Sequence, residues 1–114
     1  NRIVAGAYTS DVNGVTDSGA LLIFDKEGAS WNMSRLLTAP TTHVGDRFGV
    51  TMDCNSNGTM VAVSANITTS MLLREVDQNW QYLDYSKKIF VAMDDQGRLM
   101  AGYDAESKAY VFYE

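Results

Sequence analysis

The sequence predicts an all-β fold built of antiparallel strands. Short apolar runs rich in Val, Ile, Leu, Phe, Tyr and Thr, the residues that strands favour, recur along the chain. Clusters of Gly, Asn, Asp and Ser separate these runs about every eight to twelve residues, a spacing typical of turns between short strands. The best helical window, residues 34–49, contains Pro40 and Gly45, so it predicts no more than a turn or two of helix.

A repeat organises the chain. One apolar pattern that ends in small residues occurs three times, as NRIVAGAY from Asn1, TMVAVSAN from Thr59 and RLMAGYDA from Arg98. A second pattern follows each copy, as GALLIFDKEGASW, SMLLREVDQNW and KAYVFYE, and Trp31 and Trp80 close its first two copies. A third pattern precedes the two later copies, as FGVTMD and KIFVAMD. The period, about forty to sixty residues, indicates a repeated structural unit.

Each unit is expected to hold about four antiparallel strands, which is the sequence signature of β-propeller blades. Residues 1–47 would form a partial blade with a second, a third and a fourth strand, the fourth around residues 32–40. Residues 48–87 would form one blade, and residues 88–114 a further partial blade. These roughly ten strands amount to about two and a half blades, whereas a propeller has at least about four. We therefore expect the chain to be incomplete on its own.

The apolar runs are mostly continuous and do not alternate cleanly with polar residues. Strands of this kind are usually buried on both sides, so most strands are expected to be covered on both faces. The chain begins at Asn1, without Met and already in strand-like sequence, which predicts a cut or processed end.

Composition limits the partners and the chemistry. The chain of 114 residues has a net charge of -5, and its only adjacent bases are Lys87 and Lys88, which argues against nucleic-acid binding. Cys54 is the only cysteine, so no internal disulfide can form, and we expect a buried structural thiol. No run approaches the roughly 18 apolar residues of a membrane span, so no membrane insertion is expected.

The motifs of residues 45–65, GDRFGVTMDCNSNGTMVAVSA, resemble the FG-GAP repeats of integrin α-subunit heads and of many bacterial, phage and extracellular proteins. The similar features are Gly-Asp-x-Phe-Gly, a strand, a polar turn with Gly, and an apolar strand whose closing Gly-Ala is replaced by Ser64-Ala65. Residues 10–31, SDVNGVTDSGALLIFDKEGASW, are similar to the second loop and third strand of the family. The resemblance covers about residues 1–65, and the last unit lacks Phe-Gly.

The resemblance implies a propeller and assigns structural roles to four residues. Phe48 would anchor one blade against its neighbour, and Gly49 would let the backbone approach closely beside it. Gly6 and Ala7, which keep the Gly-Ala of the family, would lie where strands crowd the axis.

The segment DCNSNG, residues 53–58, has two interpretations. Asp53, Asn55 and Asn57 supply oxygens at alternate positions before Gly58, as in a calcium loop, and integrin-like FG-GAP repeats bind calcium in this connection. The ninth position is Val61, where the family motif has a carboxylate, so a plain turn between strands is the preferred reading. Calcium, held by those three side chains, is the only cofactor that the sequence suggests.

The segment SDVNGVTD, residues 10–17, is a weaker calcium candidate, whose oxygens would come from Asp11, Asn13 and Asp17. Its Asn13-Gly14 pair is a strong turn signal.

No catalytic site can be read from the sequence. His43 is the only histidine and Cys54 the only cysteine, so the chain offers few ligands for a zinc site. A surface position is expected for His43. Asp94 and Asp95 are adjacent, and neighbours in a strand point to opposite faces, so we expect them to start a turn. Three N-x-S/T sequons occur, at Asn32, Asn57 and Asn66, which chance explains best.

Seven aromatic side chains have two interpretations: they could contact carbohydrate or protein, or they could pack between blades. For the two tryptophans, packing between blades is the preferred interpretation. The set comprises Trp31, Trp80, Tyr82, Tyr85, Tyr103, Tyr110 and Tyr113.

The expected function is that of a non-enzymatic structural or adhesive binding module. It would belong to a larger extracellular, cell-surface or virion protein of the phage tail or fibre type. Its partners would be the remaining blades, other proteins, further copies of the chain, or carbohydrate. Two alternatives stay open: a non-catalytic platform domain of a larger enzyme, and a small virion or filament subunit that assembles by pairing of β-edges.

Overall fold

Ten β-strands and no helix make up the part of the chain that the computed structural model describes. It describes the backbone of residues 1–65, 69–86, 88–104 and 109–113, and the side chains of residues 1–65, 70–83 and 92–103. The helical window is therefore extended at its start, where residues 34–37 belong to a strand. The all-β prediction and the roughly ten strands are confirmed. None of the described residues forms a helix long and apolar enough to cross a membrane.

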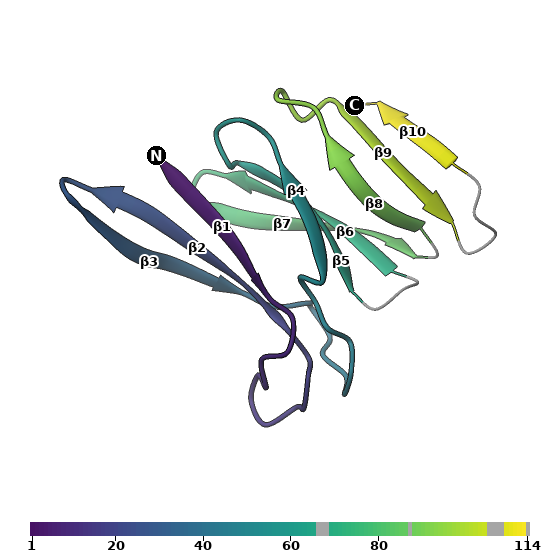
Figure 1. The fold of residues 1–114 in the computed structure, drawn as a ribbon, viewed down its shortest axis with the longest axis horizontal. Helices are drawn as coiled ribbons and strands as arrows, with labels where there is room; N and C mark the ends of the chain where they lie inside the picture. Colours follow the sequence, from purple (N-terminus) through teal and green to yellow (C-terminus); the bar gives the residue numbers. More distant parts are fainter. Residues whose placement is uncertain (66–68, 87, 105–108, 114) are drawn as a thin grey trace.

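The strands form three antiparallel sheets in which each strand pairs with its neighbours in sequence (Figure 1). The first sheet holds β1 (Arg2–Ala7), β2 (Ala20–Glu27) and β3 (Ser30–Leu37). The middle sheet holds β4 (Thr51–Cys54), β5 (Met60–Ala65), β6 (Thr69–Val76) and β7 (Asn79–Ser86). The last sheet holds β8 (Lys88–Met93), β9 (Leu99–Asp104) and β10 (Ala109–Tyr113). The sheets are small and unclosed, and they lie within residues 1–47, 48–87 and 88–114.

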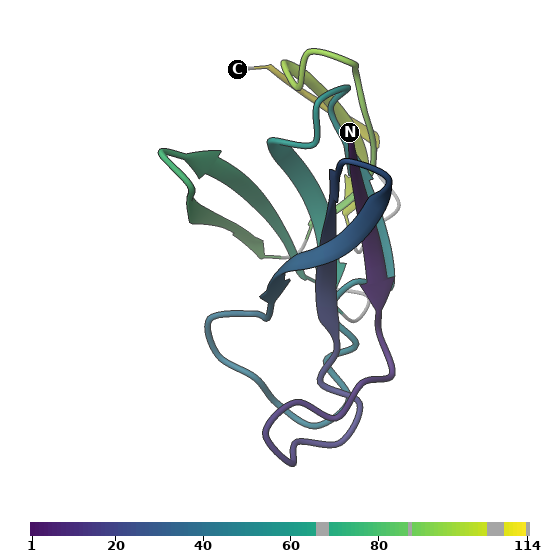
Figure 2. The same cartoon turned by 90° about the vertical axis from the view of Figure 1, so that its left-hand side faces the viewer.

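Tight turns with left-handed backbone join the paired strands. Asp77 and Gln78, with φ of 51° and 67°, connect β6 to β7, as two-residue hairpin turns require. Asn13 and Gly14, with φ of 53° and 79°, make a similar turn in the long loop after β1, which confirms the turn predicted there. This loop and the loop before β4 extend from the same end of the sheets (Figures 1 and 2).

Two strands of the middle sheet, β5 and β6, are covered on both faces. One face packs on the first sheet around a cluster formed by Leu21, Ile23, Leu37, Ala39, Phe48, Val61, Val63, Ala65 and Leu73. The opposite face packs on the last sheet through Met60, Ala62, Leu72, Met93 and Met100. All six residues of β5 are consequently buried. Between different sheets, backbone contact is most extensive between β4 and β8, the first strands of their sheets, and β8 also lies near β5 and β6.

Phe48 and three glycines join the first sheet to the middle sheet. Phe48 is fully buried, and its N–H donates to the carbonyl of Ser18 at 3.0 Å. A Cβ on Gly6 would overlap the carbonyl oxygen of Gly49, and a Cβ on Gly19 would overlap the backbone of Phe48. The close backbone approach predicted for Gly49 is confirmed, and Phe48 lies buried between the two sheets. A position of Gly6 and Ala7 near a propeller axis stays a prediction.

The expectation that most strands are covered on both faces is wrong for the outer sheets. On the first sheet the side chains of Ile3, Met33 and Leu36 are about half exposed, because no described residue packs on the face that they share. On the last sheet Leu99 and Tyr103 are exposed in the same way. A continuous apolar run predicts a buried strand but does not show whether the covering layer lies within the same chain.

Candidate functional site

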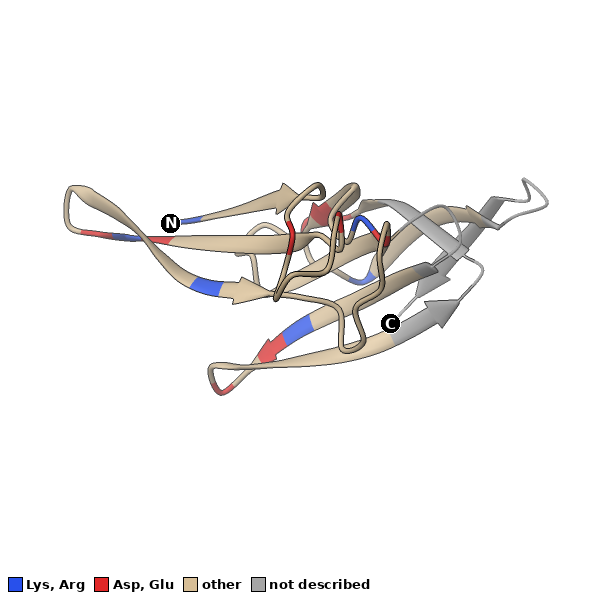
Figure 3. Cartoon of the chain, turned by 90° about the horizontal axis from the view of Figure 1, so that it is seen from below, with Lys and Arg blue, Asp and Glu red and all other residues tan. Residues whose placement is uncertain are grey.

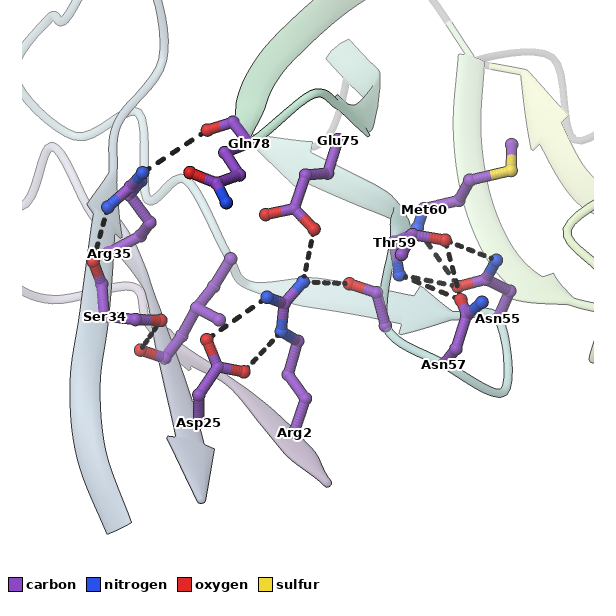
Figure 4. A network of polar contacts seen from close by, with 12 residues as sticks. Arg2, Asp25, Ser34, Arg35, Asn55, Asn57, Thr59, Met60, Glu75 and Gln78 are labelled. Carbon is purple, nitrogen blue, oxygen red and sulfur yellow. Dashed lines mark hydrogen bonds and ion pairs between the residues drawn. The ribbon is translucent and has the colours of Figure 1, made fainter. Parts of the chain in front are cut away.

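The connection between β4 and β5 is a turn that its own polar side chains hold in place (Figure 4). The side-chain oxygen of Asn55 accepts the N–H groups of Thr59 and Met60, both at 3.0 Å, while its amide nitrogen donates to the Thr59 hydroxyl. The oxygen of Asn57 accepts from the N–H and the hydroxyl of Thr59, at 3.2 Å and 2.6 Å. Gly58 has φ of 70°, which completes the reversal of the chain.

Asp53 points away from that turn and links two sheets. One of its oxygens accepts the N–H of Cys54 at 2.9 Å, and the other accepts the N–H of Met93 in β8 at 2.7 Å. The backbone continues the link, because the N–H of Ser56 donates to the carbonyl of Asp95 at 2.8 Å. The β4–β5 turn therefore lies against the β8–β9 turn, and Asp53 fixes the middle sheet to the last sheet.

The three candidate calcium ligands have competing partners. Both oxygens of Asp53 and the amide oxygens of Asn55 and Asn57 already accept hydrogen bonds from the protein. A cation would have to replace these donors, and a single carboxylate offers it little charge. Calcium binding here stays a prediction. A rise in Tm on adding calcium chloride that the Asp53→Asn variant lacks is the measurement that would establish it.

The weaker calcium candidate is also part of a turn. Asp11 accepts the N–H of Asp17 at 2.8 Å, and Asn13 lies exposed in the turn with Gly14. His43 is exposed, as predicted, with Nδ1 3.3 Å from Asp46. Among the described residues, no three His, Cys, Asp or Glu side chains are grouped so that they could hold a metal ion.

Arg2 forms the most connected polar site between sheets, and sequence reasoning missed it (Figure 4). Its Nε and Nη2 donate to the two oxygens of Asp25, at 2.6 Å and 3.1 Å. Its Nη1 donates to Glu75 of the middle sheet at 3.0 Å and to the carbonyl of Gly58 at 3.1 Å. One side chain thus joins β1, β2, the β4–β5 turn and β6. A single arginine in strand-like sequence gives no signal of this role, because its partners lie far away along the chain.

The electrostatics of this site follow from its hydrogen bonds. The bonds to Asp25 and Glu75 raise the pKa of Arg2 above its usual range. The Arg2 bond, with help from Ser34, lowers the pKa of Asp25 below its usual value. Arg2 and Asp25 are therefore both charged at neutral pH, and the cluster acts as an ion-paired clamp between sheets.

The remaining candidates occupy structural positions. Cys54 is half-buried against the core of the first and middle sheets, and burial, with a smaller effect of Asp53, raises the pKa of its thiol. Asp94 starts the turn after β8, as predicted, and its Oδ1 accepts the N–H groups of Arg98 and Leu99 at 2.7 Å and 3.1 Å. Asp95, the next residue in this turn, is exposed.

The aromatic residues divide by position. Trp80 and Tyr82 pack on the core between the first and middle sheets, and burial raises the pKa of Tyr82. Trp31 and Tyr103 are exposed, so the packing expected of both tryptophans holds only for Trp80. The side chains of Tyr85, Tyr110 and Tyr113 lie outside the described residues, as does the sequon at Asn66; Asn32 and Asn57 are exposed.

The described basic residues are dispersed over several strands and loops (Figure 3). No protein-family model, curated protein or solved structure matches the chain. The resemblance to FG-GAP repeats therefore stays a prediction from motifs.

Proposed function

We propose that the chain is a segment of a β-propeller and serves as a non-enzymatic structural or adhesive module. It would work within a larger extracellular, cell-surface or virion protein. The repeat pattern and the resemblance of residues 45–65 to FG-GAP blades support this proposal. The described polar clusters hold turns and join sheets, which is consistent with a scaffold.

The stacking of the sheets carries the proposal. All three sheets follow the same strand order, and β5 and β6 of the middle one are covered on both faces by the neighbouring sheets. Backbone contact between different sheets is most extensive between β4 and β8, each the first strand of its sheet. Blades of a propeller surround a central channel, and contact between the first strands of successive sheets is consistent with such an arrangement.

The filament alternative, assembly through β-edges, receives less support from the same observations. Pairing of edges relies on main-chain groups and needs no apolar face. In this chain the exposed apolar side chains of the first sheet gather on a face, where Ile3, Phe24 and Met33 form one cross-strand row. Packing of one sheet on another explains that distribution better than edge pairing does.

A crystal or cryo-electron microscopy structure of the intact protein that contains this segment tests the proposal. We expect successive sheets to be related by one repeated rotation about a common axis, with β4 and β8 nearest to that axis. A sandwich of two sheets, or a straight stack without a common axis, would contradict it. A hydrolase or lyase site in the same polypeptide would instead favour the enzyme-platform alternative.

A further inference from the structure

Two turns of the chain contain the dipeptide Asn-Gly, at Asn13-Gly14 and at Asn57-Gly58. In this dipeptide the backbone nitrogen of the glycine can attack the side-chain amide carbon of the asparagine. Glycine hinders the attack least, because it has no Cβ and its backbone rotates most freely. The local sequence therefore gives the two sites a similar intrinsic reactivity, and a difference between them has to come from the fold.

The Asn13-Gly14 turn leaves both reacting groups free. Both residues are exposed, and the turn is closed by its flanking residues, since the N–H of Val15 donates to the carbonyl of Val12 at 3.0 Å. Among the described residues, none bonds the side-chain amide of Asn13 or accepts the N–H of Gly14. The Gly14 nitrogen and the Asn13 amide can therefore approach each other in the folded chain, in contact with water.

The Asn57-Gly58 turn holds the same two groups apart. Gly58 is buried, and its N–H donates to the carbonyl of Asn55 at 3.1 Å. The N–H and the hydroxyl of Thr59 hold the side-chain oxygen of Asn57. The side chain of Arg2 packs against Gly58 and limits its movement. Attack at Asn57 requires these hydrogen bonds to break first, so the folded turn opposes it.

We propose that Asn13 is a site of spontaneous deamidation in the folded protein, whereas Asn57 is protected by its turn. The Gly14 nitrogen forms a bond to Cγ of Asn13, and its proton passes through solvent to the side-chain amino group, which leaves as ammonia. Water then adds to either carbonyl of the resulting cyclic imide and opens it, which gives aspartate or isoaspartate. A water molecule is consumed and an ammonia molecule is released, with no change of oxidation state. This reaction does not depend on the proposed propeller.

The modified chain should stay folded, because the reacting turn lies outside the contacts of its loop. Three backbone N–H groups within residues 45–48 donate to the carbonyls of residues 16–18, at 2.9 to 3.0 Å, and these bonds join the two long loops. Asn13 and Gly14 take part in none of them. The reaction therefore adds a carboxylate to the surface and leaves these links and the apolar cores in place.

Peptide mapping by mass spectrometry, after incubation of the folded chain at mildly alkaline pH, tests the inference. Trypsin releases residues 3–26, in which Asn13 is the only asparagine, and residues 48–74, in which fragmentation distinguishes Asn57 from the other asparagines. In the folded chain Asn13 should convert at least about 10-fold faster than Asn57, because attack at Asn57 first has to break its hydrogen bonds. In concentrated urea, where both turns are lost, the two rates should become similar.

Two variants assign the difference to the residues named. Asn13→Gln should remove the acidic species that ion exchange separates from the incubated folded chain. Thr59→Val keeps the shape of the side chain and removes the hydroxyl that binds Asn57, so it should speed conversion at Asn57 and leave Asn13 unchanged. If Asn57 converts as fast as Asn13 in the folded wild-type chain, or Asn13 converts only in urea, the inference is wrong. The comparison of folded and urea-treated wild type decides it even if a variant does not fold.

Discussion

At the scale of single residues, glycines set the distance between the first and middle sheets. Gly6 and Gly49 face each other where β1 passes the start of β4, and Gly19 lies against the backbone of Phe48. Any side chain at these positions would meet main-chain atoms, which cannot move aside as a flexible side chain can. The close packing of two sheets around Phe48 therefore depends on the absence of three Cβ atoms.

Gly6→Ala is expected to lower the free energy of unfolding by about 1–3 kcal/mol, because the new methyl group overlaps the Gly49 carbonyl and forces the sheets apart. Urea denaturation measures the change. Gly28→Ala is the control: Gly28 has φ of 62° but nothing near its Cβ position, so only backbone strain of about 1 kcal/mol applies. Equal losses in the two variants would mean that the Gly6 contact does not limit sheet packing.

The carboxylate of Asp94 is expected to stabilise the folded state at neutral pH and to lose this effect in acid. The N–H groups of Leu99 and Arg98 lower the pKa of Asp94 in the folded state, so its carboxylate stabilises the fold above the ordinary pKa. That stabilisation is lost as the pH falls through the lowered pKa. As the pH falls below the ordinary range of an aspartate pKa, the Asp94→Asn variant should lose less stability than the wild type. Asp95→Asn removes a neighbouring exposed carboxylate and should keep the wild-type pH dependence; an equal change in both variants would argue against the role of the turn.

At the scale of elements, the seam between the first and middle sheets combines an apolar interior with a polar clamp. Phe48 and its neighbours fill the interior, and Arg2 closes one side of it by binding Asp25 in its own sheet and Glu75 in the next. The side chains of these three charged residues are 17%, 28% and 18% exposed, so their bonds are shielded from water more than a surface ion pair is. The clamp therefore fixes the register of the two sheets.

Arg2→Met keeps the length of the side chain and removes its donors. We expect a loss of about 1–3 kcal/mol in the free energy of unfolding, since Asp25 and Glu75 would face each other without a cation. Arg35→Met is the control at the same seam, because Arg35 is exposed and donates only to the carbonyl groups of Ser34 and Gln78. Its loss should stay within about 0.5 kcal/mol. If both variants lose the same stability in urea denaturation, Arg2 is no more than an ordinary surface contact.

Local patterns predicted the elements well but could not predict what covers them. Repeated apolar runs and turn residues placed the strands, and the Phe-Gly motif identified Phe48 and Gly49 as packing residues, because these signals lie within a few neighbouring positions. The clamp of Arg2 joins residues more than fifty positions apart, so no local pattern reports it. Trp31 and Trp80 have equivalent sequence contexts and different burial, because the layer next to a strand is a property of the assembly.

At the scale of the whole molecule, the stack of three sheets is expected to open in a fixed order, with the exposed edge strands before the enclosed middle strand. The backbone of β5 is paired on both edges, with β4 and β6, and both its faces are covered by other sheets. In the first sheet, β3 is paired only with β2, and six of its eight residues are exposed. A strand that is enclosed on four sides opens only when the sheets separate, whereas an edge strand can open by itself.

Native-state hydrogen exchange tests this order. The amides of β5, such as those of Val61 and Val63, should exchange at least about 100-fold more slowly than the hydrogen-bonded amides of β3, because opening β5 requires loss of both apolar clusters. Phe48→Ala, which empties the cluster between the first and middle sheets, should narrow that difference by speeding exchange in β5. Val44→Ala, in an exposed loop, should leave both rates unchanged. Equal rates in β5 and β3 of the wild-type chain would show that the layers open as one unit, and a stack of separable sheets would then be the wrong description.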